Sequence, residues 1–172
     1  MFNRSCDFHC IMVKDKTEGE LTFREHKYAF RTANNHRYIA IVEEYSFSVF
    51  VVKFHLKAHS DSDNKYRILT NSEYAPSIIA TCIEIMLEHY NENPYSSFGF
   101  VGINSLDEES RENTKRFRVY RRVMENFFSP VHFTHYVYEK QSAYLMLNKD
   151  SSEPDLLEKV EDMFRRGYDF ED

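Results

Sequence analysis

The stretch Arg111–Phe128, which reads RENTKRFRVYRRVMENFF, combines two periodic stripes of side chains. Apolar residues recur at steps of three and four, the spacing of one helix face: Phe117, Tyr120, Met124, Phe127 and Phe128. Basic residues recur at steps of four, three and four on nearly the opposite face: Arg111, Lys115, Arg118 and Arg122. The stretch therefore predicts a helix that packs by one face and presents positive charge on the other.

A second helix and a short strand precede this segment. Ser77, just after Pro76, is the expected N-cap, and apolar residues follow it at helical spacing until Asn91–Pro94 ends the helix. Phe98–Ile103 reads as a short apolar strand, and Asn104–Ser110 as an acidic loop. A strand between two helices implies a helical crossover and a sheet with at least one parallel pair.

The N-terminal half predicts an antiparallel meander. Phe8–Val13 reads as a short strand and Lys14–Glu20 as a charged turn. The strongest strand pattern is Phe47–His59, where β-branched and aromatic residues dominate and apolar residues alternate with Lys and His. The meander is expected from four extended segments joined by polar turns: Thr22–Thr32, Tyr38–Glu43, Phe47–His59 and Lys65–Thr70.

The C-terminal part predicts a hairpin and a last helix. Ser129-Pro130 stops the basic helix, and Val131–Tyr138 pairs with Ala143–Leu147. Ser152, with Pro154 in the first turn, is expected to open a helix that stops at Gly167. The fold class is therefore α+β: one domain over residues 1–172, with a mixed, mostly antiparallel sheet and two to three packed helices.

Composition bounds the function. The chain has 172 residues and a net charge of −6, which counts against general binding to nucleic acid or membrane surfaces. Only 4 glycines argue against a glycine-rich cofactor loop. We expect no membrane span and no signal peptide, and three cysteines, an odd number, fit a reducing cytoplasm.

The order of elements resembles that of the GNAT acetyltransferases, in which a meander is followed by helix, strand, helix and closing hairpin. In that family an Arg/Gln-x-x-Gly-x-Gly/Ala loop before the first of these helices binds the coenzyme A pyrophosphate through its amides. The matching segment here, Thr70–Ser77, lacks glycine and arginine and contains Glu73 and Pro76. The resemblance implies an acyl-CoA-dependent N-acetyltransferase with a divergent coenzyme site, and acetyl-CoA as its cofactor.

The chain also resembles small uncharacterised bacterial proteins of similar length. The residues that carry the resemblance are short motifs: YAFRT at 28–32, HRY at 36–38, the strand around Tyr45–Phe54, and Arg111 with RFRVYRR at 116–122. The pattern in that family has an Arg-x-Arg-Leu-aromatic core, where this chain has Val119 and Tyr120. The resemblance implies neither a substrate nor a catalytic residue.

Our first hypothesis is a non-catalytic, cytoplasmic interaction module whose binding residues are the basic stripe Arg111, Lys115, Arg118 and Arg122. Its partner would be a protein or a second copy of the chain, with the acidic tail Asp169–Asp172 as a further contact. The competing interpretation is a solvated helix face, neutralised by the acidic loop just upstream. A third hypothesis is single-stranded nucleic-acid binding through Arg116, Arg118, Arg121 and Arg122.

The remaining reactive residues predict no active site and no metal site. Cys6, His9 and Cys10 lack the fourth ligand of a structural zinc site, and Cys82 falls on the apolar face of a helix. His132 and His135 are expected on opposite faces of a strand, whereas His55 and His59 share one face without a carboxylate partner. No catalytic residue is therefore assigned.

Overall fold

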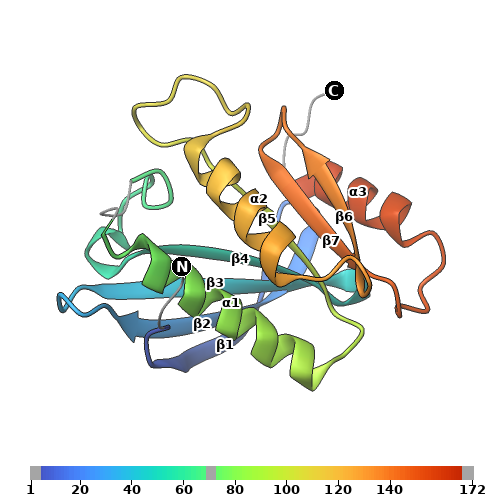
Figure 1. The fold of residues 1–172 in the computed structure, drawn as a ribbon, viewed down its shortest axis with the longest axis horizontal. Helices are drawn as coiled ribbons and strands as arrows, with labels where there is room; N and C mark the ends of the chain where they lie inside the picture. The colour runs from blue at the N-terminus through green and yellow to red at the C-terminus, as the bar shows by residue number, and fades with distance from the viewer. Residues whose placement is uncertain (1–4, 69–72, 168–172) are drawn as a thin grey trace.

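The structure is a computed structural model that describes residues 5–68 and 73–167. It contains a seven-stranded sheet in the order β1-β2-β3-β4-β5-β7-β6, with three α-helices (Figure 1). The elements are β1 (Phe8–Glu18), β2 (Leu21–Arg31), β3 (Arg37–Tyr45), β4 (Val49–Leu56), α1 (Ala75–Glu92), β5 (Ser97–Val101), α2 (Lys115–Phe127), β6 (Phe133–Tyr138), β7 (Ala143–Asn148) and α3 (Leu156–Gly167). The predicted α+β class with a mixed, mostly antiparallel sheet is confirmed. No helix in the described ranges has the length and apolar character needed to span a bilayer.

The meander contains four strands, as predicted, but its members differ: β1 belongs to it, and the described part of the expected strand at Lys65–Thr70 does not. The expected charged turn at Lys14–Glu20 is wrong, because β1 continues to Glu18 and the chain turns at Gly19, whose φ is 58°. The expected strand at Lys65–Thr70 is also wrong over its described part, residues 65–68. There the backbone closes turns instead, with the Lys65 amide donating to Ser62 and the Arg67 amide to Asn64.

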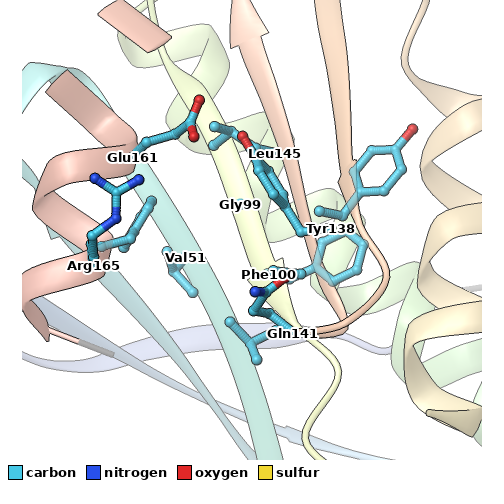
Figure 2. Close-up of a pocket in the computed structure, with 12 residues that line it drawn as sticks. Val51, Gly99, Phe100, Tyr138, Gln141, Leu145, Glu161 and Arg165 are labelled. Carbon is cyan, nitrogen blue, oxygen red and sulfur yellow. The ribbon is translucent and has the colours of Figure 1, made fainter. Parts of the chain in front are cut away.

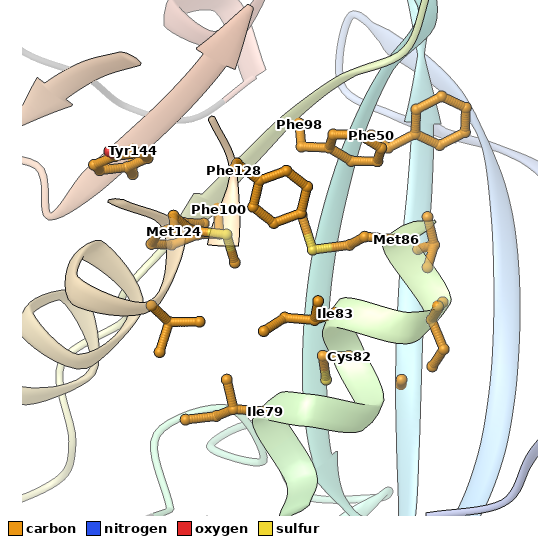
Figure 3. Packing of buried hydrophobic residues seen from close by; sticks show 14 of the residues in the cluster. Phe50, Ile79, Cys82, Ile83, Met86, Phe98, Phe100, Met124, Phe128 and Tyr144 are labelled. Carbon is orange, nitrogen blue, oxygen red and sulfur yellow. The ribbon is translucent and has the colours of Figure 1, made fainter. Parts of the chain in front are cut away.

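The helices lie on both faces of the sheet. α1 and α2 cover one face, and α3 covers the other (Figure 1). The larger core lies under α1 and α2 and is rich in aromatic rings; Figure 3 shows Phe50, Phe98 and Phe128 packed beside Met86. The smaller core lies under α3 and includes Val160 and Met163. The sheet is therefore buried from both sides at its centre, as a parallel strand pair requires.

Each predicted helix is present, but all three begin at a different residue. α2 begins at Lys115 instead of Arg111, because the Thr114 side chain accepts a hydrogen bond from the Phe117 amide at 3.2 Å and caps the helix. α1 begins at Ala75, with Pro76 in the first turn instead of before the cap. α3 begins at Leu156 instead of Ser152, since Asp155 has a φ of 54° that no right-handed helix accommodates.

The predicted apolar stripe of α2 is mostly confirmed. Phe117, Met124 and Phe128 are buried and Tyr120 is half-buried, whereas Phe127 at the end of the helix is 53% exposed. Arg111 lies ahead of the helix, so the basic stripe is helical only from Lys115 onward. The docking face of the segment was predictable, but its first turn was not.

Candidate ligand-binding site

The candidate site lies where the only parallel pair in the described sheet comes apart. β4 and β5 pair at Val49 with Ser97, Phe50 with Phe98 and Val51 with Gly99, and the pairing ends there although β4 continues to Leu56. Two cavities lie beside this point, one on each face of the sheet, and both are lined by Gly99 and Phe100. In open sheets, ligands bind at the carboxyl ends of parallel strands, so the position itself is typical of a ligand site.

The smaller cavity lies between α1, α2 and the sheet and measures about 30 Å³. Its lining is apolar except for two groups that carry a proton, Cys82 of α1 and Tyr120 of α2. The Tyr120 ring meets Phe100 edge-on, with 5.0 Å between the ring centroids. Burial raises the pKa of Tyr120 and raises the pKa of Cys82 to about 12, so both groups are protonated at neutral pH.

The larger cavity lies on the α3 face and measures about 140 Å³ (Figure 2). Val51 and Leu145 line its floor, while Glu161 and Arg165 reach it from α3. Tyr138 of β6 also lines it. Burial raises the pKa of Tyr138, and the negative charge of Glu161 and a hydrogen bond to that carboxylate raise it further.

Arg116 lies against Phe54, which lines the smaller cavity, and is less exposed than the basic stripe. Its Cζ lies 6.0 Å from the centroid of the Phe54 ring, and one guanidinium nitrogen donates to the Ile68 carbonyl at 2.5 Å. Burial lowers the pKa of Arg116, and no carboxylate within residues 5–68 or 73–167 forms an ion pair with it. A half-buried cation of this kind favours the approach of an anion.

The predicted basic stripe is exposed and partly neutralised. Lys115 forms an ion pair with Asp107 at 2.7 Å, and the hydrogen bond from Lys115 lowers the pKa of Asp107 to about 2. Arg118 donates to the Asn113 carbonyl at 2.6 Å. Arg121 contacts Glu125 and Glu139, each at 3.0 Å, whereas Arg111 and Arg122 are exposed to solvent. The acidic tail Asp169–Asp172 lies outside the described residues.

Sequence reasoning missed a buried pair of carboxylates on the α3 face. Glu25 and Glu43 are directly opposite each other on β2 and β3 and are 6% and 5% exposed. Glu25 is paired with Lys16 at 3.0 Å, and Glu43 with Lys53. The sequence could have shown this burial. In the alternation along each strand, both glutamates occupy positions on the side where the neighbouring apolar residues face inward. Their charges are matched by the two lysines, so they offer no free anion.

Two histidines lie side by side between β2 and α1: the ring centroids of His26 and His89 are 4.8 Å apart, His26 hydrogen-bonds Glu44 at 2.7 Å, and His89 hydrogen-bonds the Tyr28 hydroxyl at 3.0 Å.

The histidine pairs that the sequence singled out are not brought together in this way. His59 lies in the short turn Lys57–His59, so it does not share a strand face with His55 as predicted. His135 hydrogen-bonds the Tyr144 hydroxyl at 2.6 Å, and His132 lies before β6. Within the described ranges, no three His, Cys, Asp or Glu side chains are placed to hold a metal ion.

The cysteines should differ sharply in their reactivity. Cys10 is exposed, whereas Cys82 is 8% exposed and its pKa is raised to about 12 by burial. We expect a thiol reagent at about pH 8 to modify Cys10 fully and to leave Cys82 unmodified until the protein is unfolded, because only thiolates react. Peptide mass spectrometry after a timed reaction would check this. Equal labelling of both residues in the folded protein would contradict it.

No family model matches the chain, and neither a curated protein nor a solved structure matches it significantly.

Proposed function

We propose that the chain is a GNAT-like, acyl-CoA-dependent N-acyltransferase with a divergent coenzyme site. The observation that carries this proposal is the end of the β4–β5 pairing at Val51 and Gly99, with a cavity on each face of the sheet. Two substrates approaching from opposite faces would meet at Gly99 and Phe100. Such an arrangement suits the transfer of a group between two molecules.

The unpaired edge of β4 suits the arm that carries the acyl group, whereas the smaller cavity, at about 30 Å³, has room for little more than a methyl-sized end group. This arm is long and extended and bears amide groups, so it needs backbone hydrogen-bond partners as well as apolar contacts. The edge of β4 beyond Val51 pairs with β3 on one side, and β5 does not pair with it on the other. An extended ligand placed there would gain main-chain hydrogen bonds, as a peptide does when it adds to a sheet edge.

Tyr120 is the residue best placed to help the leaving group. Attack of an amine on a thioester forms the carbon–nitrogen bond and breaks the carbon–sulfur bond, which leaves a thiolate. Tyr120 lines the smaller cavity and holds its proton because burial raises its pKa. The hydroxyl of Tyr120 can therefore donate a hydrogen bond to the departing sulfur and stabilise the thiolate.

Positive charge beyond the C-terminal end of β4, where β4 no longer pairs with β5, supports a phosphorylated ligand. Lys57, Lys65 and Arg67 follow β4 and outnumber Asp61 and Asp63 of the same segment, and the Arg116 guanidinium lies against Phe54. A phosphate group near Arg116 would offset the cost of burying that cation. The expected departures from the coenzyme loop at Thr70–Ser77 fall partly outside the described residues, since 69–72 are not described. The chemistry of this segment thus stays a prediction.

The test is the melting temperature of the full chain with acetyl-CoA. A ligand that binds only the folded state, at about 100 times its Kd, adds about 2.7 kcal/mol of stability, which is roughly 5–10 °C for a chain of this size. Arg116→Gln should reduce the shift, whereas Arg118→Gln, on the outer face of the same helix, should not. The same shift with ATP, or none with millimolar acetyl-CoA, would overturn the proposal.

The second candidate is the non-catalytic, cytoplasmic interaction module. The observation in its favour is the exposure of Arg111, Arg118 and Arg122, which form no ion pair within the described chain. An acidic protein surface or a second copy of the chain would match this charge. Nucleic acid is disfavoured, since Arg116 is turned inward and Arg121 is held by two glutamates. The free cysteines Cys6, Cys10 and Cys82 fit the cytoplasm under either proposal.

A further inference from the structure

The larger cavity has the size and lining for a single apolar group. Its volume is about 140 Å³, and Val51, Phe100, Leu145 and Phe164 contribute apolar surface to its wall. A cavity of roughly 150 Å³ lined by apolar side chains holds one benzene ring. The body of a fitting ligand is therefore an aromatic ring or a branched aliphatic chain.

One anion and one cation lie at the α3 side of this cavity. Glu161 and Arg165 are one helical turn apart on α3, and both line the cavity (Figure 2). Side chains at this spacing are roughly 5–6 Å apart at Cβ and often form an ion pair. Here the two form no ion pair within the described chain, and Glu161 instead interacts with the Tyr138 hydroxyl.

Of the two arginines at the end of α3, Arg165 and Arg166, it is Arg165 that is available to a ligand. Arg166 does not line the cavity and forms an ion pair with Asp162 at 2.9 Å. Arg165 is exposed, lines the cavity and forms no ion pair with a described carboxylate. A guanidinium in this position binds a carboxylate group through two parallel hydrogen bonds.

We propose that the larger cavity binds a free α-amino acid with an apolar side chain. The side chain fills the cavity, Arg165 binds the carboxylate, and Glu161 binds the ammonium group. A zwitterion satisfies both charged residues at once, whereas a simple amine would leave Arg165 without a partner. As the acceptor, which rests on the proposed acyl transfer, the ammonium group loses one proton to Glu161 and the resulting amine attacks the thioester carbon. As the carbon–nitrogen bond forms and the carbon–sulfur bond breaks, the nitrogen releases a second proton and the departing thiolate takes up a proton to leave as a thiol.

Binding is tested first, without acetyl-CoA, by isothermal titration calorimetry. L-phenylalanine or L-leucine should bind at least about tenfold more tightly than phenylalanine amide, 3-phenylpropionate or glycine, because each of these lacks one of the three recognised groups. Arg165→Gln should remove the preference for the free acid over the amide. Arg166→Gln is the matched control and should leave that preference unchanged.

Several results would overturn the inference. These are equal binding of the acid and the amide, equal effects of the two arginine variants, or no binding of any amino acid at millimolar concentration. Acetylation is then measured separately by mass spectrometry with acetyl-CoA added. Selective amino-acid binding without acetylation would refute the acyl transfer and keep the amino-acid site. Acetylation of simple amines with no preference for amino acids would refute the site and keep the transfer.

Discussion

Replacing Gly102 with alanine should lower the free energy of unfolding by about 3 kcal/mol or more. A Cβ atom at this position would lie 2.5 Å from the Phe117 backbone nitrogen and 2.7 Å from its Cα. These atoms belong to the first turn of α2, so no side-chain rotation relieves the contact. The Gly102 carbonyl also accepts from the Thr114 hydroxyl at 2.5 Å, and its amide donates to Ser142 at 2.8 Å. Any shift of the helix would break these bonds as well.

Urea unfolding monitored by circular dichroism would measure the loss. Gly99→Ala is the matched control, because its Cβ would meet Leu145 and the Tyr144 carbonyl at an ordinary 3.5 Å. We expect that variant to stay within about 1 kcal/mol of the wild type, since alanine restricts the unfolded chain more than glycine does. Equal losses in the two variants would show that the approach of α2 to β5 is not close.

His55 should make the protein less stable as the pH falls from about 6.5 to about 4. The side chain is 5% exposed, and burial, followed by the charge of Lys65, lowers its pKa from 6.5 to about 4. In this interval the folded protein keeps His55 neutral while the unfolded chain binds a proton. Stability is therefore full above about pH 6.5, and about 3 kcal/mol of it is lost by about pH 4.

The measurement compares the free energy of unfolding near pH 7 and near pH 4.5 in the wild type and in His55→Gln. Burial also lowers the pKa of His89 and of His135, so some acid sensitivity should persist in the variant. The difference between the two pH profiles isolates His55. A variant that loses as much stability with acid as the wild type would contradict the assignment.

The sheet and the packing faces were largely predictable from local patterns. The buried side of the strands follows from the alternation of apolar and polar residues along residues 22–56. The buried side of α2 follows from the three- and four-residue steps between apolar residues from Phe117 to Phe128. The starts of the helices were predicted wrongly where a single local hydrogen bond decides the first residue. Thr114 ends the loop before α2 by capping the Phe117 amide, which excludes Arg111 from the helix.

The candidate site was not predictable, because no contiguous motif encodes it. Val51, Gly99, Leu145 and Glu161 come from four different elements and meet only after β7 has been placed between β5 and β6. The basic stripe drew attention because its residues are near in sequence. Arg116, within the same stretch, turns inward because Phe54 and the Ile68 carbonyl lie beneath it, and neither is close to it along the chain.

The three-residue ladder between β4 and β5 also has a consequence for folding. On one side of it, β1 to β4 pair in the order in which they occur in the chain. This half of the sheet therefore forms from contacts between residues that are close together in the sequence. The ladder itself must wait until α1 has brought β5 back alongside β4. The two halves of the sheet are therefore expected to open as separate cooperative units, and the amides of Phe98 and Gly99 should exchange with solvent before those at the centre of β3.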